Sequence, residues 1–316
     1  GEGMIGIAGA GAFGTALAVA LASGGRQVVL WGRDDALRAT RQSPRLPGVV
    51  LPDGVILAEN VSDLAESGVT LLALPMQQLR GFLSGPGAPL LSADLIACCK
   101  GIDLTTLKGP AEVMDEAGAT GQLGVLTGPS FAADIARGLP TALTLACAGT
   151  RAEAMQALLS TPTLRLYRTD DVVGAELGGA LKNVIAIAAG VVIGAGLGDS
   201  ARAALVTRGY AEMQRLALAL EARAETLAGL SGLGDLVLTC TSAQSRNFAH
   251  GIALGAGRPV AQATVEGVAT ARAAVRLAAS LGIEMPVAAM VARLVADEIG
   301  VAEAVRQLMS RPLKQE

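Results

Sequence analysis

Lys182 stands at the head of a long apolar segment, an unusual place for an ammonium group. The surrounding sequence is ELGGALKN at 176–183, and sixteen uncharged residues, counted from Asn183, follow before Asp199. Burying an unpaired charge is costly, and a buried lysine tends to lose its proton instead. Two interpretations follow: the lysine stem lies on the core while its head reaches water, or Lys182 is a catalytic acid.

Two glycines lie one helical turn before this lysine. On a helix the side chain of Lys182 leans back over Gly178 and Gly179. Glycine inside a helix costs roughly 1 kcal/mol relative to alanine, so a pair of glycines needs a reason. We interpret them either as open space where a cofactor or substrate approaches Lys182, or as a helix–helix contact that leaves the lysine pointing outward.

A second set of residues suited to chemistry is the loop GAGAFG at 9–14, which follows a short apolar strand and opens a helix. Gly9 allows the tight turn, Gly11 lets the backbone approach a pyrophosphate, and Gly14 lets the helix pack on the strand. The unpaired N–H groups and the dipole of the helix N-terminus favour phosphate. The loop predicts dinucleotide binding, with a glycine-rich packing turn as the structural alternative.

The choice of dinucleotide depends on WGRD at 31–34, at the end of the second predicted strand. Arg33 can bind a 2′-phosphate, whereas an acid here would bind the ribose hydroxyls of NAD, and Asp34 is the competing residue. We predict that NADP(H) is preferred and that NAD(H) is the second cofactor to consider. The structural alternative for Arg33 is a solvated surface residue.

Composition limits the classes of protein to consider. The chain has 316 residues, which is long for one core, so two domains are expected. Hydrophobic residues make up 51% and charged residues 17%, which argues against disorder. The net charge is −3 and aromatic residues make up 2%, so neither a phosphate-tracking stripe nor base stacking is indicated. We expect no nucleic-acid partner.

Cysteine and histidine usage argues against a metal site. The four cysteines lack a CxxC spacing and two are adjacent: Cys98, Cys99, Cys147 and Cys240. This pattern fits neither zinc binding nor a disulfide framework, and a reducing cytoplasm suits it best. His250 is the single histidine, so a multi-histidine metal site is excluded and lysine is the remaining candidate acid.

Two apolar stretches could be mistaken for targeting or membrane segments. Residues 4–23 lack a basic leader and carry glycines at fixed spacing, and residues 183–198 are short for a bilayer. We therefore expect a cytoplasmic protein without membrane insertion.

The elements that position these residues change character along the chain. The first half alternates helical stretches with predicted strands at 4–8, 27–31, 69–75, 94–100, 123–129 and 141–147. This order predicts an α/β fold with a mostly parallel, Rossmann-type sheet. Beyond residue 170 the apolar period becomes helical, so we expect a dinucleotide-binding domain at 1–175 and an all-α catalytic domain at 176–316.

Two amphipathic helices are expected in the second domain. One covers 199–220 and should be capped by Asp199 or Ser200; the other covers 265–282. The apolar helices of this domain are compatible with a homodimer.

Six motifs in register resemble the NAD(P)-dependent glycerol-3-phosphate dehydrogenases of bacteria. They are GAGAFGTA, CCKGID at 98–103, LTGPSFAADIARGLPTA at 126–142, ELGGALKN, GLSGLGDLVLTCTSAQSRN at 229–247 and VEGV at 265–268. The similarity runs from about residue 4 to about residue 295. It implies a Rossmann domain followed by a helical domain of the 6-phosphogluconate-dehydrogenase type. It also implies interconversion of dihydroxyacetone phosphate and sn-glycerol 3-phosphate, which feeds phospholipid synthesis.

The resemblance assigns roles residue by residue. Lys182 matches the general acid/base, Lys100 the second active-site lysine, and Asp235 a residue of the substrate pocket. The cofactor residues are the loop Gly9, Gly11, Ala12, Phe13 and Gly14, together with Arg33, Lys100, Ala132, Arg246 and Glu266. The substrate residues are Lys100, Gly128, Ser130, Lys182, Asp235, Ser245, Arg246 and Asn247, to which we add the hydroxyl of Thr239. The chain departs from the family at Ser200, where asparagine is usual, and after Asn247, where an arginine often follows.

The residues themselves leave structural alternatives open. Arg246 offers a bidentate guanidinium and Asn247 an amide for a phosphate dianion, but Ser245 could simply cap a helix while Arg246 is solvated. Asp235 could accept a substrate hydroxyl, orient Lys182, or cap a helix.

Lys100 has its own alternative. Ligands bind beyond the carboxyl ends of strands in open α/β sheets, and Lys100 follows a predicted strand. There it could neutralise charge near the substrate carbonyl; otherwise it is a surface loop lysine.

Two rival functions remain at this point. A related reductase acting on another small hydroxy acid or phosphosugar would share the loop and the lysine. A dinucleotide-binding sensor without turnover would need no general acid, and the set Lys100, Lys182 and Asp235 argues against it.

Overall fold

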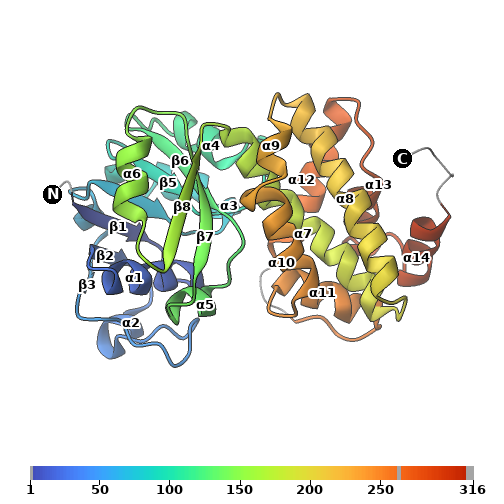
Figure 1. Cartoon of the computed structure of the whole chain (residues 1–316), viewed down its shortest axis with the longest axis horizontal. Coiled ribbons are helices and arrows are strands. Elements are labelled where there is room, and N and C mark those ends of the chain that lie inside the picture. Colours follow the sequence, from blue (N-terminus) through green and yellow to red (C-terminus); the bar gives the residue numbers. More distant parts are fainter. Residues whose placement is uncertain (1–2, 262–264, 311–316) are drawn as a thin grey trace. The chain divides into compact units, whose positions relative to one another are not determined.

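The chain forms two compact units in the computed structural model, which describes residues 3–261 and 265–310. The sheet unit comprises the chain up to Lys100 and the segment Lys108–Glu176. The helical unit comprises Gly101–Leu107 and the chain from Leu177 onward. Figure 1 shows the sheet unit in blue to green and the part of the helical unit that follows Glu176 in yellow-green to red.

The sheet unit is built on eight strands in the order β3-β2-β1-β4-β5-β6-β7-β8. Their bounds are β1 Met4–Ala8, β2 Gln27–Trp31, β3 Val55–Leu57, β4 Val69–Leu72, β5 Leu95–Ala97, β6 Leu123–Thr127, β7 Thr141–Cys147 and β8 Leu164–Thr169. The first six pair in parallel in the order 3-2-1-4-5-6, the doubly wound order of a dinucleotide-binding fold. The Rossmann-type prediction is therefore confirmed.

Helices cover both faces of this sheet because strand side chains alternate between faces. Ile7 lies in the core with α1 and α6, and its neighbour Ala8 lies in the opposite core with α3 and α4. The helices of the unit are α1 Ala12–Ser23, α2 Asp35–Thr40, α3 Met76–Ser84, α4 Pro110–Glu116, α5 Ala132–Ala136 and α6 Ala152–Leu159.

Several strand expectations need correction. The strands expected at 69–75, 94–100 and 123–129 end earlier, at Leu72, Ala97 and Thr127. The residues beyond these ends are the loops at the carboxyl edge of the sheet. In addition, β7 pairs antiparallel to β6, so the sheet is mixed, and β3 and β8 were not expected.

The strand β8 escaped the sequence analysis because its pattern is half polar. Leu164 and Leu166 are buried, whereas Arg165 and Tyr167 between them are exposed. This two-residue alternation is typical of a strand with one solvated face, but it is short and rich in charge.

The helical unit contains the C-terminal elements. They are most of α7 Val172–Gly194, α8 Asp199–Ala219, α9 Ala224–Leu227, the π-helical turn η3 Leu230–Gly234, α10 Asp235–Thr241, α11 Arg246–Gly255, α12 Glu266–Ser280, α13 Pro286–Val295 and α14 Val301–Met309. The segment Gly101–Leu107 also belongs here because Ile102 packs in the helical core. The predicted domain limits did not foresee this excursion of the chain.

The expected side-chain cap of α8 is wrong. Its N-cap is Gly198 at φ 91°, and among the described residues no side chain caps this helix. Asp199 instead lies in the first turn, where its charge favours the positive end of the helix dipole.

Helix α7 is long and apolar enough to cross a membrane, yet 89% of its most apolar window is buried inside the protein. It packs on α11 at backbone distance: a Cβ on Gly190 would overlap the carbonyl of Phe248, and one on Gly251 the carbonyl of Ile187. Its apolar character is that of a core helix.

Candidate active site

The candidate residues of the sheet unit gather at one edge of the sheet. The loop 9–14 follows β1, Arg33 follows β2, Lys100 follows β5, and Gly128 follows β6. These four strands run parallel, so all of their carboxyl ends point to the same edge. In open α/β sheets this edge is where ligands bind.

The glycines of loop 9–14 have the geometry that a phosphate-binding turn requires. Gly9 has φ 116°, and a Cβ there would overlap the carbonyl of Ala73. A Cβ on Gly14 would overlap the carbonyl of Gly9, whereas one on Gly11 would meet no described atom within 4 Å. The turn is closed at Gly9 and Gly14 and open at Gly11, as the approach of a pyrophosphate needs.

The donors of the first turn of α1 complete this phosphate site. Gly11 is the N-cap, and within the described part of the chain no side chain accepts the N–H groups of the first turn, which Ala12 and Phe13 begin. A phosphate can take this place. The N–H of Gly9 donates to the carbonyl of Trp31 at 2.8 Å, which ties the loop to the end of β2.

Arg33 and Asp34, the two candidates for binding the adenosine ribose, differ in the contacts that they make. Asp34 is the N-cap of α2, and its carboxylate accepts the N–H of Ala36 at 2.8 Å. Arg33 is exposed immediately after β2. The acid thus has a structural role while the guanidinium faces solvent.

Lys100 lies three residues beyond the end of β5 and is partly exposed. Its Nζ lies 5.9 Å from the centroid of the Phe13 ring, a cation–π contact between two predicted cofactor residues. The buried thiol of Cys98 lies nearby: burial raises the pKa of Cys98 to about 12, and the charge of Lys100 opposes this rise.

Three further candidates follow β6 in the sheet unit. Gly128 has φ 147° and packs against Leu143, so a side chain would be strained there. The hydroxyl of Ser130 donates to the Gly128 carbonyl at 3.4 Å, and Ala132 begins α5. They form a compact turn at the same sheet edge as Lys100.

In the helical unit, Lys182 is buried and paired. It lies on α7 with 4% of its surface exposed, and its Nζ donates to Oδ2 of Asp235, which is fully buried. Neither the outward-pointing lysine nor a side-chain cap of α10 describes these residues. The contact between Asp235 and Lys182 is the one that the orienting alternative requires.

The packing around Gly178 shows why a glycine stands at this position of α7. A Cβ on Gly178 would overlap the carbonyl of Ser231, which lies in the π-helical turn just before Asp235. The glycine therefore lets α7 approach the turn that delivers the carboxylate. The expectation of open space is wrong at Gly178, and close packing is right, although Lys182 points inward.

Three neighbours complete the surroundings of the ion pair. Thr239, one turn along α10, donates its hydroxyl to Oδ1 of Asp235 at 3.2 Å, so both carboxylate oxygens are engaged. Burial raises the pKa of Cys240 to about 12; Lys182 and Arg202 oppose the rise and Asp235 adds to it. Sequence analysis did not single out Arg202 or Cys240, and only their tertiary neighbours identify them.

The start of α11 combines a cap with two polar side chains. Ser245 caps the helix by accepting the N–H of Phe248 at 3.2 Å, and Arg246 is exposed. Asn247 is buried, and its Oδ1 accepts the N–H of Gly267 at 2.9 Å. That bond joins the start of α11 to the start of α12, where Glu266 lies.

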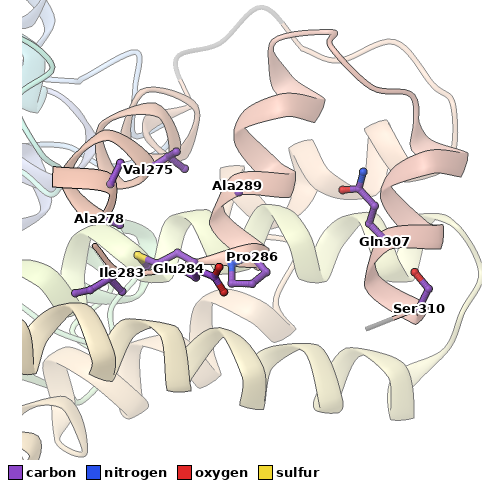
Figure 2. A pocket seen from close by; sticks show the side chains of 10 residues that line it. Val275, Ala278, Ile283, Glu284, Pro286, Ala289, Gln307 and Ser310 are labelled. Atoms are coloured by element: carbon purple, nitrogen blue, oxygen red, sulfur yellow. The ribbon is translucent and has the colours of Figure 1, made fainter. Parts of the chain in front are cut away.

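The structure thus brings two groups of predicted residues together within the helical unit: Lys182, Asp235 and Thr239, and the start of α11 with that of α12. A separate cavity of about 680 Å³ lies between α12, α13 and α14 (Figure 2). Its described lining is mainly apolar and contains no candidate residue: Val275, Ala278, Ala279, Ile283, Glu284, Met285, Pro286, Ala289, Gln307 and Ser310.

Comparison with known proteins agrees with this arrangement. Residues 4–153 match the N-terminal and residues 171–306 the C-terminal part of NAD-dependent glycerol-3-phosphate dehydrogenase. The chain is 61% identical over 314 residues to the glycerol-3-phosphate dehydrogenase [NAD(P)+] of Paracoccus denitrificans, covering 99% of each chain. It is 63% identical over 317 residues to that of Cereibacter sphaeroides, covering 99% of this chain and 100% of the relative.

A solved structure extends the comparison to three dimensions. The glycerol-3-phosphate dehydrogenase of Coxiella burnetii has a TM-score of 0.92 at 34% identity, covering 98% of this chain and 99% of that chain. The resemblance deduced from the six motifs is confirmed. The chain belongs to the NAD-dependent glycerol-3-phosphate dehydrogenase family.

Proposed function

We propose that this chain catalyses the reversible reduction of dihydroxyacetone phosphate to sn-glycerol 3-phosphate, with Lys182 as general acid/base. The observation that carries the proposal is the buried pair of Lys182 and Asp235. The family membership supports it, and so does the phosphate-binding geometry of loop 9–14.

In this proposal Lys182 donates and accepts the proton of the reaction. A ketone that gains hydride at carbon needs a proton at oxygen, which the ammonium can donate as negative charge develops there. In the reverse direction, neutral Lys182 accepts the hydroxyl proton. The carboxylate of Asp235 accepts a hydrogen bond from Nζ of Lys182 and so holds this group in place inside the protein.

The sheet edge would hold the cofactor. When bound, the nicotinamide supplies or accepts the hydride. We propose contacts from loop 9–14, with Ala12 and Phe13 at the helix N-terminus, and from Arg33, Lys100, Ala132, Arg246 and Glu266. The open face of Gly11 and the uncapped first turn of α1 in the described chain support the pyrophosphate site.

The substrate phosphate would be held by charge and by fixed donors. We propose Arg246 as its guanidinium partner, since this residue is exposed at the start of α11, where the helix dipole also favours an anion. Asn247 and the cap Ser245 lie beside it. We propose Lys100, Gly128, Ser130, Asp235 and Thr239 as the remaining substrate residues.

NADP(H) is the proposed preferred cofactor. Asp34 is engaged in capping α2, which leaves Arg33 as the charged group for the adenosine ribose. Titration of the protein with NADPH and NADH checks this. Affinity for NADH equal to or better than that for NADPH would reject the preference.

The experiment that tests the reaction follows NADPH absorbance with dihydroxyacetone phosphate. Wild type should consume NADPH, and Lys182→Ala should be slower by at least about two orders of magnitude while still binding NADPH. Near-normal turnover of the variant would reject the acid. No consumption by wild type, with NADH also tried, would reject the reaction and favour a reductase for another substrate.

We further propose that the protein works in the cytoplasm, supplies glycerol 3-phosphate for phospholipid synthesis, and forms a homodimer. Exposed apolar side chains of the helical unit, such as Leu218 and Val237, support association. Light scattering at micromolar concentration tests the dimer, and a monomer mass would reject it.

A further inference from the structure

Glu176 is an acidic residue of α7 that the proposed reaction does not use. It lies six residues before Lys182 on the same helix and is partly exposed. Its Oε2 accepts the N–H of Ala111, at the start of α4, at 3.1 Å. Both partners belong to the sheet unit. The carboxyl group therefore ties the first turns of α7 to a segment 65 residues earlier.

The receiving segment is shaped for this carboxyl group. A Cβ on Gly109 would overlap Oε2 of Glu176, so the carboxyl group lies in the space that the glycine leaves beside the backbone. Helix α4 begins with Pro110, and no side chain of its own N-cap, Gly109, can accept an N–H. Glu176 supplies the missing acceptor from another part of the chain.

The surroundings of Glu176 disfavour its ionised form, which makes this carboxyl group an unfavourable choice for capping a helix. Burial raises the pKa of Glu176 to about 8; Glu112 adds to the rise and the N–H of Ala111 opposes it. Lys108 does not offset this effect because it is paired with Glu116. A helix cap needs no such perturbed group, whereas functional sites often contain them.

The other charged groups on α7, and Asp171 just before it, are more distant along the chain. Asp171 precedes Glu176 by five residues, and its carboxylate accepts the N–H of Gly174 at 3.1 Å. Lys182 follows by six residues and is held by Asp235. Glu112 on α4 is therefore the neighbouring charge that acts on Glu176.

We propose that Glu176 is a positioning residue for Lys182: by accepting the N–H of Ala111, it holds the first turns of α7 and so fixes the helix that carries the lysine. A helix transmits the position of its first turns to residues two turns later because its backbone is hydrogen-bonded throughout. The inference rests on the proposed role of Lys182 as the acid.

We expect the contact between Glu176 and Ala111 to depend on pH. The neutral carboxyl group can accept the N–H of Ala111 inside the protein, whereas the carboxylate faces both burial and Glu112. The folded-state pKa of Glu176, about 8, is above the ordinary value of 4.5 for a glutamate. Its contribution to stability is therefore present below pH 4.5 and is lost as the pH rises towards 8. Above that pH we expect the carboxylate to turn toward water, because burial and Glu112 outweigh the favourable N–H of Ala111, and this would release the first turns of α7.

The test measures kcat and KM of wild type, Glu176→Gln and Glu176→Ala from pH 6.5 to 9.5. Glutamine keeps the acceptor and cannot ionise, so its kcat relative to wild type should rise about fivefold or more over this range. Alanine should lower kcat at neutral pH by about threefold or more, with little change in the KM for NADPH. A ratio of glutamine variant to wild type that stays flat with pH would overturn the proposal, as would full activity of Glu176→Ala.

Two further measurements keep the proposal separate from the proposed reaction. Glu112→Gln removes the neighbouring charge, so the midpoint of the wild-type pH effect should move to lower pH, and an unchanged midpoint would contradict the assignment. Hydrogen exchange of the Ala111 amide reports the tie without turnover. It should accelerate in Glu176→Ala beyond the general effect seen in Glu112→Gln, and equal exchange would reject the tie. A wild type inactive on dihydroxyacetone phosphate would reject the reaction alone.

Discussion

The two candidate lysines are held in opposite ways. Lys182, in the helical unit, is buried against a buried carboxylate that is itself engaged by Thr239. Lys100, in the sheet unit, is partly exposed and lies over the ring of Phe13 at 5.9 Å. One lysine is fixed by charge inside a core, and the other rests on an aromatic face at the sheet edge.

This difference agrees with the different roles that we propose for the two lysines. Removing one partner of a buried ion pair costs about 3–5 kcal/mol, so the geometry of Lys182 is strongly enforced. The cation–π contact of Lys100 contributes about 0.5–1 kcal/mol at a partly exposed site, much less than the buried pair. The enforced position of Lys182 suits its proposed role as proton donor.

The largest effect is expected from breaking the buried pair. Asp235→Ala should lower the free energy of unfolding by about 3–5 kcal/mol, because it leaves the Lys182 charge buried and unpaired. Turnover should fall by at least about a hundredfold. Urea unfolding and NADPH consumption measure the two effects.

A double variant separates stability from activity. Asp235→Leu combined with Lys182→Met removes both charges and should restore most of the lost stability, while turnover stays abolished. If Asp235→Ala were as stable as wild type, the pair would not be the enforced feature described above.

Removal of the other lysine should harm activity without harming the fold. Lys100→Met is expected to lower kcat/KM about a hundredfold, since the proposed role of Lys100 is to neutralise charge at the reacting carbonyl. The free energy of unfolding should change by less than about 1 kcal/mol. Lys108→Met is the matched control, because Lys108 is an exposed lysine paired with Glu116. Equal losses of stability in Lys100→Met and Asp235→Ala would erase the contrast.

Each lysine also has a buried thiol as a local reporter. The pKa of Cys98 and that of Cys240 are both raised by burial to about 12, so both should react slowly with iodoacetamide at pH 8. Burial is the main cause of the raised pKa of Cys240, and Asp235→Asn removes an anion that adds to it, so alkylation of Cys240 should accelerate. Mass spectrometry of the labelled peptides distinguishes alkylation of Cys240 from that of Cys98. The alkylation rate of Cys98 should not change. Equal acceleration at both thiols would indicate general loosening instead.

The smallest effect is expected from weakening the aromatic contact. Phe13→Leu keeps an apolar side chain but removes the ring face beneath Lys100, so kcat/KM should fall about threefold. Steady-state kinetics of this variant in the Lys100→Met background provide the control. An additional threefold loss in that background would show that Phe13 acts independently of Lys100.

The sequence predicted elements whose signal is local. Strands β1, β2 and β7 have the expected bounds, and loop 9–14 lies between strand and helix as its spacing requires. Strand ends were less predictable, as at β5, because the apolar run continues through Cys98 and Cys99 into the loop. The pattern of hydrophobic residues does not distinguish a buried strand from the buried turn that follows it.

Partnerships between distant segments could not be derived from spacing. Lys182 and Asp235 are 53 residues apart, and only the tertiary structure shows that the carboxylate meets the lysine and does not cap α10. The same holds for Glu176 and Ala111, whose contact depends on a glycine at 109. In each case the contact depends on which backbone segments approach closely. A small residue in the sequence indicates that some segment can approach, but it does not identify which one.

The end of β2 has a spectroscopic consequence. Trp31 is the one tryptophan of the chain, and its carbonyl accepts the N–H of Gly9 in the cofactor loop. Its ring lies 5.9 Å from that of Phe82, in the same sheet unit. All indole fluorescence of this protein therefore arises beside the proposed dinucleotide site. Its emission is a built-in optical probe of that site, which serves equally well in variants that no longer turn over.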